Sequence, residues 1–275
     1  MTIDKRIKLH DGQEMPLFGL GVYLSEEGSE CYDAIKHALD AGYRLIDTAA
    51  FYKNEKSVGQ AIRDSHIDRE DIFVTTKLWN THHGYDKALR AFDKSMAALG
   101  LDYVDLYLVH YPVQGIRKET WRAMEQILSD GRCRSIGVSN YMERHLRELL
   151  DHCEHRPTVN QIELHPYCFE SRRETVELCR QEEIVIQAYS PLLRTRRFDD
   201  PKLLALAHKY QKTPAQILIR WALEENISVI PKSSNGLRIR QNADVFDFSI
   251  SSEDMERLRL FNENFIVCWD PEETP

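Results

Sequence analysis

Ionisable side chains end three successive apolar segments in the first half of the chain. Asp47 ends RLID, Lys77 ends IFVTTK and His110 ends DLYLVH. A fourth group, Tyr52, follows Asp47 by five residues in what we predict to be a loop. An acid, an amine, an imidazole and a phenol can together hold and move a proton, provided that the fold brings them to one place.

Together, these four side chains suit the protonation of an oxygen atom that gains negative charge. A tyrosine is a poor acid at neutral pH because its ordinary pKa is about 10. We expect Lys77 to lower the pKa of Tyr52, since a nearby ammonium favours the phenolate, and Asp47 to keep Lys77 charged and in place. His110 would orient and polarise a carbonyl oxygen by hydrogen bonding. The set predicts carbonyl reduction with Tyr52 as the general acid.

Each of the four residues also has a simpler explanation. Alone, Asp47 is typical of a helix cap or an ion-pair partner, and Lys77 of a solvated charge. Tyr52 alone would be a packing residue, and His110 a hydrogen-bonded core histidine. These explanations weaken because all four residues are predicted to lie on one rim of the fold.

The segments around these residues alternate between strand-like and helical patterns. The turn dipeptide Asp11-Gly12 first predicts a small N-terminal β-hairpin. Near-continuous apolar runs, typical of buried parallel strands, then occupy residues 18–24, 44–47, 72–79, 104–112, 135–140, 159–164, 184–191 and 228–233. Helical periodicity is found between and after them at residues 29–42, 54–65, 85–100, 117–131, 142–153, 171–183, 201–212, 213–226 and 237–246.

Eight strand–helix units with a period of about 30 residues fit either a closed (β/α)8 TIM barrel or a doubly wound open sheet. The number of units and the chain length favour the closed α/β barrel. No linker of low complexity indicates a second domain, so we expect residues 1–275 to form one domain. In such a barrel the C-terminal ends of the strands open on one face, and adjacent strands lie about 4.8 Å apart. This architecture would bring the four side chains together.

The composition argues against several other kinds of protein. Among 275 residues, 42% are hydrophobic and the net charge is -8, which fits a large core and argues against a nucleic-acid surface. No apolar run is long enough for a membrane helix, and the N-terminus lacks the apolar core of a signal peptide. The six cysteines include no C-x-x-C pair, so we expect free thiols in a reducing, cytoplasmic environment and no metal site. No long exposed apolar stripe is evident, which favours a monomer.

A second candidate site follows the last predicted strand. Lys232, Ser233 and Ser234 precede Arg238 at the start of a helix, and such a set can bind a phosphate group. The alternative is a capped helix with exposed basic residues. No G-x-G-x-x-G motif follows any strand and no Walker A motif is present, so neither of these nucleotide-binding modes is supported.

Several long segments, spread in order over nearly the whole chain, match the pattern of a known family. They are MPLFGLGVY, AGYRLIDTAAFYKNEKSVGQAI, FVTTKLW, LGLDYVDLYLVHYP, IGVSNY, NQIELHPY, AYSPL and IPKSSNGLRIRQNADVFDF. On these segments the chain resembles the aldo-keto reductases, and most of all the compact bacterial members similar to 2,5-diketo-D-gluconate reductases and methylglyoxal-reducing enzymes. The resemblance implies a TIM barrel that binds NADPH in an extended pose, with hydride delivered from nicotinamide C4 to a carbonyl carbon.

The resemblance also implies roles for individual residues. The residues that match the catalytic tetrad of the family are Asp47, Tyr52, Lys77 and His110, with Tyr52 as the acid in reduction and the base in alcohol oxidation. The residues that match NADPH-binding positions are Ser139, Asn140 and Gln161 for the carboxamide, Tyr189 for the nicotinamide ring, Ser190 and Leu192 for the pyrophosphate, Lys232, Ser233 and Arg238 for the 2′-phosphate, and Gln241 and Asn242 for adenine. The residues that match substrate-binding positions are Tyr23, Trp79, His110 and Tyr111.

Three segments and one single residue depart from the family pattern. Leu193 follows Ser-Pro-Leu where many relatives have glycine, and the basic stretch Arg-Thr-Arg-Arg, residues 194–197, comes next. We therefore expect the loop over the cofactor to close differently or to add charge near the pyrophosphate. Ser234-Asn235-Gly236 replaces the usual Val-Thr-Pro, and Gln241 replaces a common glutamate. The tail, residues 262–275, is short and acidic, which predicts a more open substrate pocket.

The leading functional hypothesis is the NADPH-dependent reduction of small aldehydes and ketones. The substrates would include dicarbonyls such as methylglyoxal and keto-sugars such as 2,5-diketo-D-gluconate. A second hypothesis is an NADP(H)-sensing or regulatory subunit on the same scaffold, and a third is a structural protein that has lost the chemistry. The intact set of four residues argues against both of these alternatives.

Overall fold

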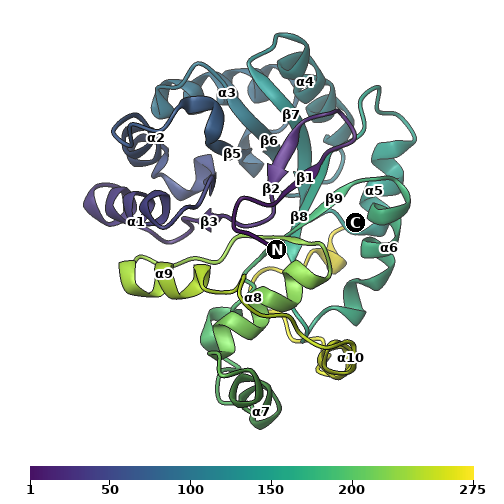
Figure 1. Ribbon diagram of the computed structural model, residues 1–275. Coiled ribbons are helices and arrows are strands. Elements are labelled where there is room, and N and C mark those ends of the chain that lie inside the picture. Colours follow the sequence, from purple (N-terminus) through teal and green to yellow (C-terminus); the bar gives the residue numbers. More distant parts are fainter.

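Eight parallel strands form a curled sheet that is surrounded by helices in the computed structural model, which describes residues 1–275 (Figure 1). The strands are β3 Leu20–Gly21, β4 Leu45–Asp47, β5 Phe73–Leu78, β6 Val104–Val109, β7 Cys133–Ser139, β8 Val159–Glu163, β9 Val185–Tyr189 and β10 Ser228–Val229. Each strand pairs with the next one along the chain. Phe18, just before β3, pairs in parallel with Val229 of β10, so the first and last strands close the barrel. The predicted (β/α)8 barrel is confirmed.

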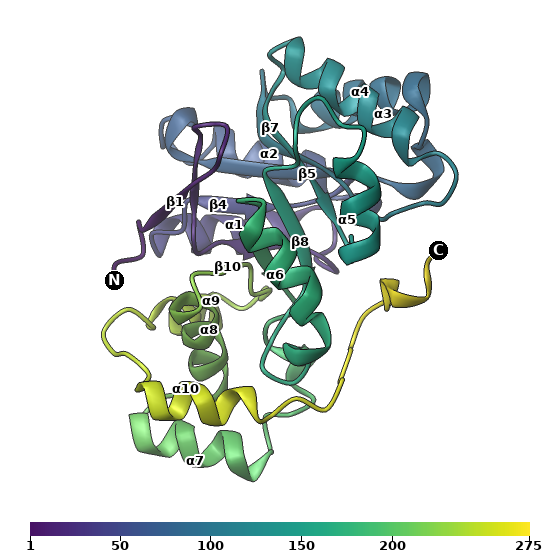
Figure 2. The ribbon, with the colours of Figure 1, turned by 90° about the vertical axis from the view of Figure 1, so that its right-hand side faces the viewer.

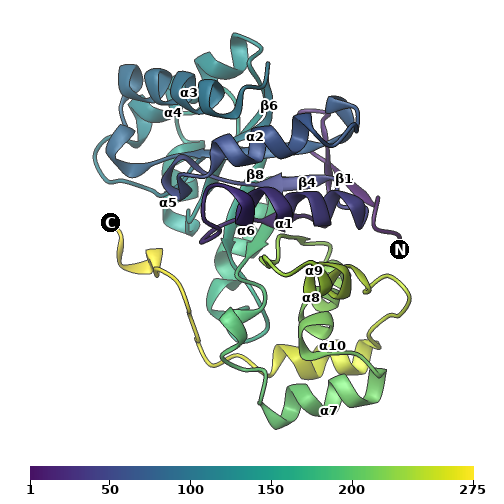
Figure 3. The same ribbon diagram turned by 90° about the vertical axis from the view of Figure 1, so that its left-hand side faces the viewer.

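The helices lie on the outside of this barrel. They are α1 Ser29–Asp40, α2 Glu55–Arg63, α3 Tyr85–Leu99, α4 Arg117–Ser129, α5 Glu143–Leu150, α6 Arg173–Gln181, α7 Pro201–Tyr210, α8 Pro214–Glu224, α9 Gly236–Ala243 and α10 Ser252–Arg259. The predicted hairpin is also present, as the antiparallel pair β1 Arg6–Lys8 and β2 Glu14–Pro16. Figures 2 and 3 show the N-terminal hairpin and the C-terminal tail at opposite ends of the molecule.

The inside of the barrel changes from apolar to polar along its axis. The hairpin and the strands contribute an inner apolar cluster made of Leu9, Met15, Leu45, Phe73, Leu106, Leu108, Val159, Val185 and Ile230. Side chains two residues apart on a strand share a face. Asp47 therefore lies above Leu45 on β4, and Gln161 above Val159 on β8. The polar residues come at the C-terminal ends of the strands, where the candidate site lies.

Two features of the fold differ from the sequence-based expectation. The first core strand is shorter than residues 18–24, because the chain turns after Val22 and Leu24 adopts a left-handed conformation with a φ of 60°. Helix α10 was not anticipated. Ser251 caps it by accepting a hydrogen bond from the backbone N–H of Asp254. A Ser followed three residues later by an acid is a helix-start signal, so the sequence did contain the information.

The carboxylate of Asp254 fastens α10 to α7. It lies within 2.5 Å of the Lys209 Nζ and 2.6 Å of the Tyr210 hydroxyl, and it accepts a further hydrogen bond from Ser251. Partial burial would raise the pKa of Asp254, but these hydrogen bonds outweigh it and lower the pKa to about 2. The folded state therefore prefers the carboxylate form.

We expect Asp254→Asn to lower the free energy of unfolding by about 1–2 kcal/mol at pH 7. Because the pKa of Asp254 is lower in the folded than in the unfolded chain, this contribution is complete above about pH 5 and declines as the pH falls toward about 2. Urea unfolding at pH 7 and pH 3 should show a smaller difference between the two proteins at pH 3. Glu256→Gln, an exposed acid on the same helix, is the control. A difference that does not depend on pH would contradict the prediction.

The six cysteines form no disulfide in the structure. None of the helices has the length and apolar character that crossing a membrane requires.

Candidate active site

The four predicted residues come together at the C-terminal end of the barrel. Asp47 is the last residue of β4, Lys77 lies near the end of β5, and His110 directly follows β6. Tyr52 ends a short 3-10 turn, Ala50–Tyr52, in the loop after β4. The neighbouring positions of β4, β5 and β6 in the sheet explain why residues 63 positions apart in the chain meet.

Lys77 is at the centre of the cluster. Its Nζ donates to Asp47 Oδ1 at 2.6 Å and to the backbone oxygen of Thr48 at 2.8 Å, and lies 3.2 Å from the Tyr52 hydroxyl. The Lys77 side chain is 0% exposed and that of Asp47 is 2% exposed, so the two form a buried ion pair. A buried ammonium needs acceptors for its donors, and Lys77 has one for each of its three protons.

The phenol of Tyr52 keeps its proton at neutral pH. Burial, and then the negative charge of Asp47, raise the pKa of Tyr52 well above 10. We had expected Lys77 to lower the pKa of Tyr52, but the overall shift is upward. Removal from water disfavours the phenolate more strongly than the nearby ammonium favours it. The consequence still suits proton donation, since the acid is fully protonated before any reaction.

His110 is neutral for the same physical reason. Burial, with the positive charge of Lys77 adding to it, lowers the pKa of His110 well below 6.5. The imidazole ring lies edge-on to Tyr52, with 5.7 Å between the ring centroids. Asn140 donates to the backbone oxygen of His110 at 2.9 Å and so ties the end of β6 to the end of β7. A neutral imidazole can donate one hydrogen bond to a carbonyl oxygen without supplying a competing charge.

The second oxygen of Asp47 belongs to a chain of amides across the barrel. Gln161 donates to Asp47 Oδ2 at 2.7 Å and to the side-chain oxygen of Gln187 at 2.6 Å. Gln187 donates in turn to Ser228, whose hydroxyl donates to the backbone oxygen of Pro16 in the hairpin. Asp47 and the Pro16 oxygen can only accept, so the direction of every bond in this chain is fixed.

The four residues assigned to nicotinamide also lie together. Ser139 donates to the backbone oxygen of Gln161 at 2.9 Å, and Asn140 donates to the Ser139 hydroxyl at 3.1 Å. Tyr189 at the end of β9 donates to the side-chain oxygen of Asn140 at 2.7 Å. These four residues lie on β7, β8 and β9 or directly after them, next to the four-residue cluster.

The basic loop after β9 has an unusual backbone. Ser190, Leu193, Arg194 and Thr195 all have a φ between 48° and 66°, a left-handed conformation that non-glycine residues rarely adopt. Leu192 lies within this loop, as predicted. Each left-handed residue of this kind costs about 1–2 kcal/mol, so four of them within six residues make this a strained turn.

The five residues assigned to the adenosine part lie just before α9 and along it. Asn235 caps this helix by accepting from the backbone N–H of Arg238 at 3.0 Å. Lys232 has only a distant carboxylate partner, Glu30 at 3.8 Å, and Arg238 has none. Exposed cations without close partners at a helix N-terminus fit a phosphate group. The other three residues assigned to the adenosine part are Ser233, which precedes the helix, and Gln241 and Asn242, which lie within it.

Two of the three predicted aromatic substrate residues lie directly beside the cluster. The Tyr23 ring is 4.9 Å from the Tyr52 ring, and the Trp79 ring is 5.2 Å from that of His110. Tyr111 instead points its hydroxyl at Thr274 in the tail, 2.7 Å away.

The sequence reasoning missed two other aromatic residues. Phe51 stacks on Trp79 at 3.8 Å, and Trp269 of the tail lies 5.8 Å from each of these two rings. The tail therefore does not leave this side of the site open as expected. A signal for Phe51 was its position next to Tyr52, and a signal for Trp269 was a large apolar residue in an otherwise acidic tail.

Comparison with known proteins adds independent findings. Residues 19–263 match the model of the "Aldo/keto reductase family". The chain is 46% identical to an uncharacterised oxidoreductase, YtbE, of Bacillus subtilis, over 98% of this chain and 97% of the relative. It is 45% identical to a glyoxal reductase of the same organism, over 99% and 98% of the two chains. A crystal structure of a Bombyx mori aldo-keto reductase in complex with NADP has a TM-score of 0.90, at 38% identity and with 98% of this chain and 96% of that chain covered.

Proposed function

The chain belongs to the aldo/keto reductase family, and on that premise we propose that it reduces small aldehydes and ketones to alcohols with NADPH. The observation that carries the proposal is the position of the Tyr52 hydroxyl. It lies 3.2 Å from the Lys77 ammonium and beside neutral His110, with a pKa high enough to keep its proton.

Tyr52 would protonate the carbonyl oxygen of the substrate. When bound, NADPH would supply the hydride that reduces the carbonyl carbon. As Tyr52 gives up its proton, the Lys77 ammonium is the nearest positive charge to the new phenolate and stabilises it. Asp47 keeps that ammonium in place, and neutral His110 orients the carbonyl oxygen by donating a hydrogen bond. In the direction of alcohol oxidation the Tyr52 phenolate acts as the base.

We propose that residues of the site bind NADPH along its length. Ser139, Asn140 and Gln161 offer hydroxyl and amide groups for the carboxamide, and the ring of Tyr189 lies beside them. We assign Ser190 and Leu192 to the pyrophosphate, and Lys232, Ser233, Arg238, Gln241 and Asn242 to the 2′-phosphate and adenine. The support for the phosphate assignment is that neither Lys232 nor Arg238 has a close carboxylate partner.

Methylglyoxal and related dicarbonyls are the substrates that we consider first. A relative that is 45% identical over nearly its whole length is described as a glyoxal reductase. Keto-sugars such as 2,5-diketo-D-gluconate and aromatic aldehydes are the other members of the test panel. The experiment is to follow NADPH oxidation with each compound and to compare kcat/KM. No turnover of any carbonyl compound would reject the proposal and favour an NADP(H)-sensing role.

Arg238 supplies a test of cofactor preference. We expect Arg238→Ala to raise the KM for NADPH by about 10- to 100-fold, because a hydrogen-bonded ion pair with the 2′-phosphate would be lost. NADH lacks this phosphate, so its KM should change by less than about twofold. Arg240→Ala removes another exposed arginine of the same helix and serves as the matched control. Equal losses for NADPH and NADH would reject the assignment of Arg238.

A further inference from the structure

The tail, residues 262–275, crosses the C-terminal face of the barrel after α10. Figure 2 shows it as the yellow segment that runs from α10 past α6 toward α5. Its only regular element is a short turn, Pro271–Glu273. The tail nevertheless has a defined path, because several side chains of the barrel bind it, among them Arg117 at Pro275 and His145 at Thr274. Two buried charged residues, Glu163 and Arg172, bind it on either side of Trp269.

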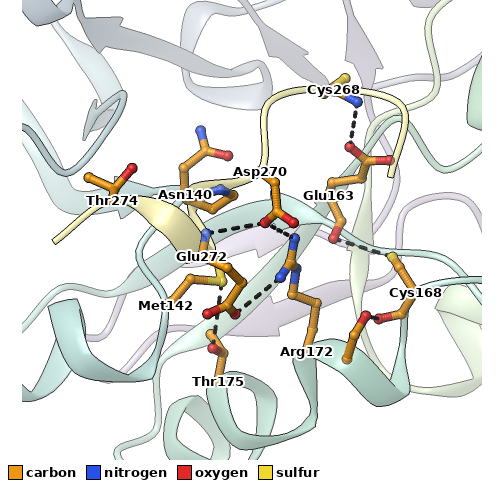
Figure 4. A network of polar contacts seen from close by, with 12 residues as sticks. Asn140, Met142, Glu163, Cys168, Arg172, Thr175, Cys268, Asp270, Glu272 and Thr274 are labelled. Carbon is orange, nitrogen blue, oxygen red and sulfur yellow. Dashed lines mark hydrogen bonds and ion pairs between the residues drawn. The ribbon is translucent and has the colours of Figure 1, made fainter. Parts of the chain in front are cut away.

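Glu163 holds the first part of the tail. It is the last residue of β8 and is 2% exposed. Its carboxylate accepts from the backbone N–H groups of Val267 and Cys268, at 2.7 Å and 2.9 Å. Figure 4 shows this carboxylate pointing toward the tail. A buried carboxylate that binds two successive backbone N–H groups fixes the direction of the chain at that point.

Arg172 holds the second part. Its side chain is 2% exposed, and its guanidinium donates to Asp270 Oδ1 at 2.7 Å and to Glu272 Oε1 at 3.1 Å (Figure 4). The two tail carboxylates are themselves less than half exposed. On the surface, Arg144 pairs with Glu272 at 3.2 Å and donates to backbone oxygens of the tail, including those of Pro271 and Thr274. Because burying a guanidinium without acceptors is costly, Arg172 requires the tail in this position.

Trp269 is the residue between these two attachments. Cys268 before it is bound by Glu163, and Asp270 after it is bound by Arg172. The ring of Trp269 is therefore placed against Phe51 and Trp79, with Trp79 in turn beside His110. Although the side chain is 49% exposed, its backbone has little freedom to move away.

We propose that Arg172 is a positioning residue that sets substrate preference by holding Trp269 at the wall of the active site. The inference rests on the proposed reductase activity and adds the substrate class that this wall favours. A compact dicarbonyl offers little surface for contact with the tail, whereas an aromatic aldehyde gains contact area from the rings of Phe51, Trp79 and Trp269. Arg172 thus favours carbonyl compounds that carry an aromatic or extended apolar group.

The first test compares 4-nitrobenzaldehyde with methylglyoxal in Arg172→Met. We expect the ratio of their kcat/KM values to fall by about fivefold to tenfold, mainly through the KM for the aromatic aldehyde. The KM for NADPH should stay unchanged. Arg173→Met is the matched control, because Arg173 is the next residue along the chain but is exposed and pairs only with Glu170. An unchanged ratio in Arg172→Met would overturn the proposal.

A double-mutant cycle tests whether Arg172 acts through Trp269. Trp269→Ala should lower the same ratio, and Arg172→Met should lower it little further when combined with Trp269→Ala. If the two substitutions lowered the ratio independently, so that the loss in the double variant equalled the product of the two single losses, the proposal would be overturned. If Arg172→Met unfolds too easily to assay, Asp270→Asn removes the shorter of the two ion pairs from its exposed side, without removing the Arg144–Glu272 pair, and must lower the same ratio.

A measurement that does not depend on enzyme activity can test this inference separately from the proposed function. Limited digestion with chymotrypsin, followed by mass spectrometry, measures how readily the chain is cut after Trp269. Faster cutting in Arg172→Met, with no change in Arg173→Met, would show that Arg172 holds the tail even if no carbonyl compound were reduced. Equal rates in the wild type and Arg172→Met would overturn the attachment. Turnover of the panel by the wild type tests the proposed function alone.

Discussion

Tyr52→Phe should lower kcat for carbonyl reduction by about 10²- to 10⁴-fold, the usual contribution of a positioned general acid. The ring would keep its contacts with Tyr23 and His110, so the shape of the site should not change. Only the hydroxyl would be lost, together with its contact to the Lys77 ammonium. Cofactor binding should therefore stay within about twofold, because no residue assigned to NADPH depends on that hydroxyl.

The measurement is a steady-state kcat for methylglyoxal together with the Kd for NADPH from quenching of protein fluorescence. Tyr107→Phe is the control. Tyr107 is another buried tyrosine, but its hydroxyl has no hydrogen-bond partner, so removing it should change neither quantity. A near-normal kcat in Tyr52→Phe would show that another group supplies the proton. A large loss of NADPH affinity would show that Tyr52 acts in binding instead.

The meeting of the catalytic residues could be predicted because it depends only on the order of the strands. Asp47, Lys77 and His110 each come where an apolar run ends, and consecutive runs become adjacent parallel strands. In a parallel barrel their ends must lie on the same face. The position of Tyr52 followed because a loop of a few residues cannot carry it far from Asp47.

The tail could not be predicted in this way, since its path depends on contacts rather than on a repeating pattern. Glu163 and Arg172 look like ordinary charged residues of a strand end and a helix start. Their partners lie about one hundred residues away, at Cys268 and Asp270. A chain segment without regular structure gives no periodicity from which such partners could be inferred.

The direction of the pKa shift of Tyr52 could not be predicted from the sequence either. The sequence showed that a lysine would lie near the phenol, and this favours ionisation. It did not show that the surrounding protein would remove much of the water from the phenol, and this desolvation decides the sign here. The directions of the pKa shifts of Asp47 and Lys77 could not be predicted from the sequence either. Burial raises the pKa of Asp47 and lowers that of Lys77, while their mutual attraction opposes both shifts.

Lys77→Met should therefore affect stability and turnover at once. Asp47 would remain buried with only Gln161 as a side-chain donor. Breaking a buried ion pair on one side costs about 3–5 kcal/mol of the free energy of unfolding. The loss should grow as the pH rises above about 4, because the buried acid is neutral at low pH and its charged form is the one that burial disfavours. We also expect kcat to fall by at least about 100-fold, since the phenolate of Tyr52 would lose its positive neighbour.

The double variant Asp47→Asn/Lys77→Met separates the two effects. It removes both charges, so urea unfolding at pH 7 should show that most of the lost stability returns. Turnover should not return, because no cation stabilises the phenolate while Tyr52 gives up its proton. If kcat recovered together with stability, Lys77 would act only by holding the site in shape. If stability failed to recover, the cost would come from lost packing around the lysine stem and not from the unpaired carboxylate of Asp47.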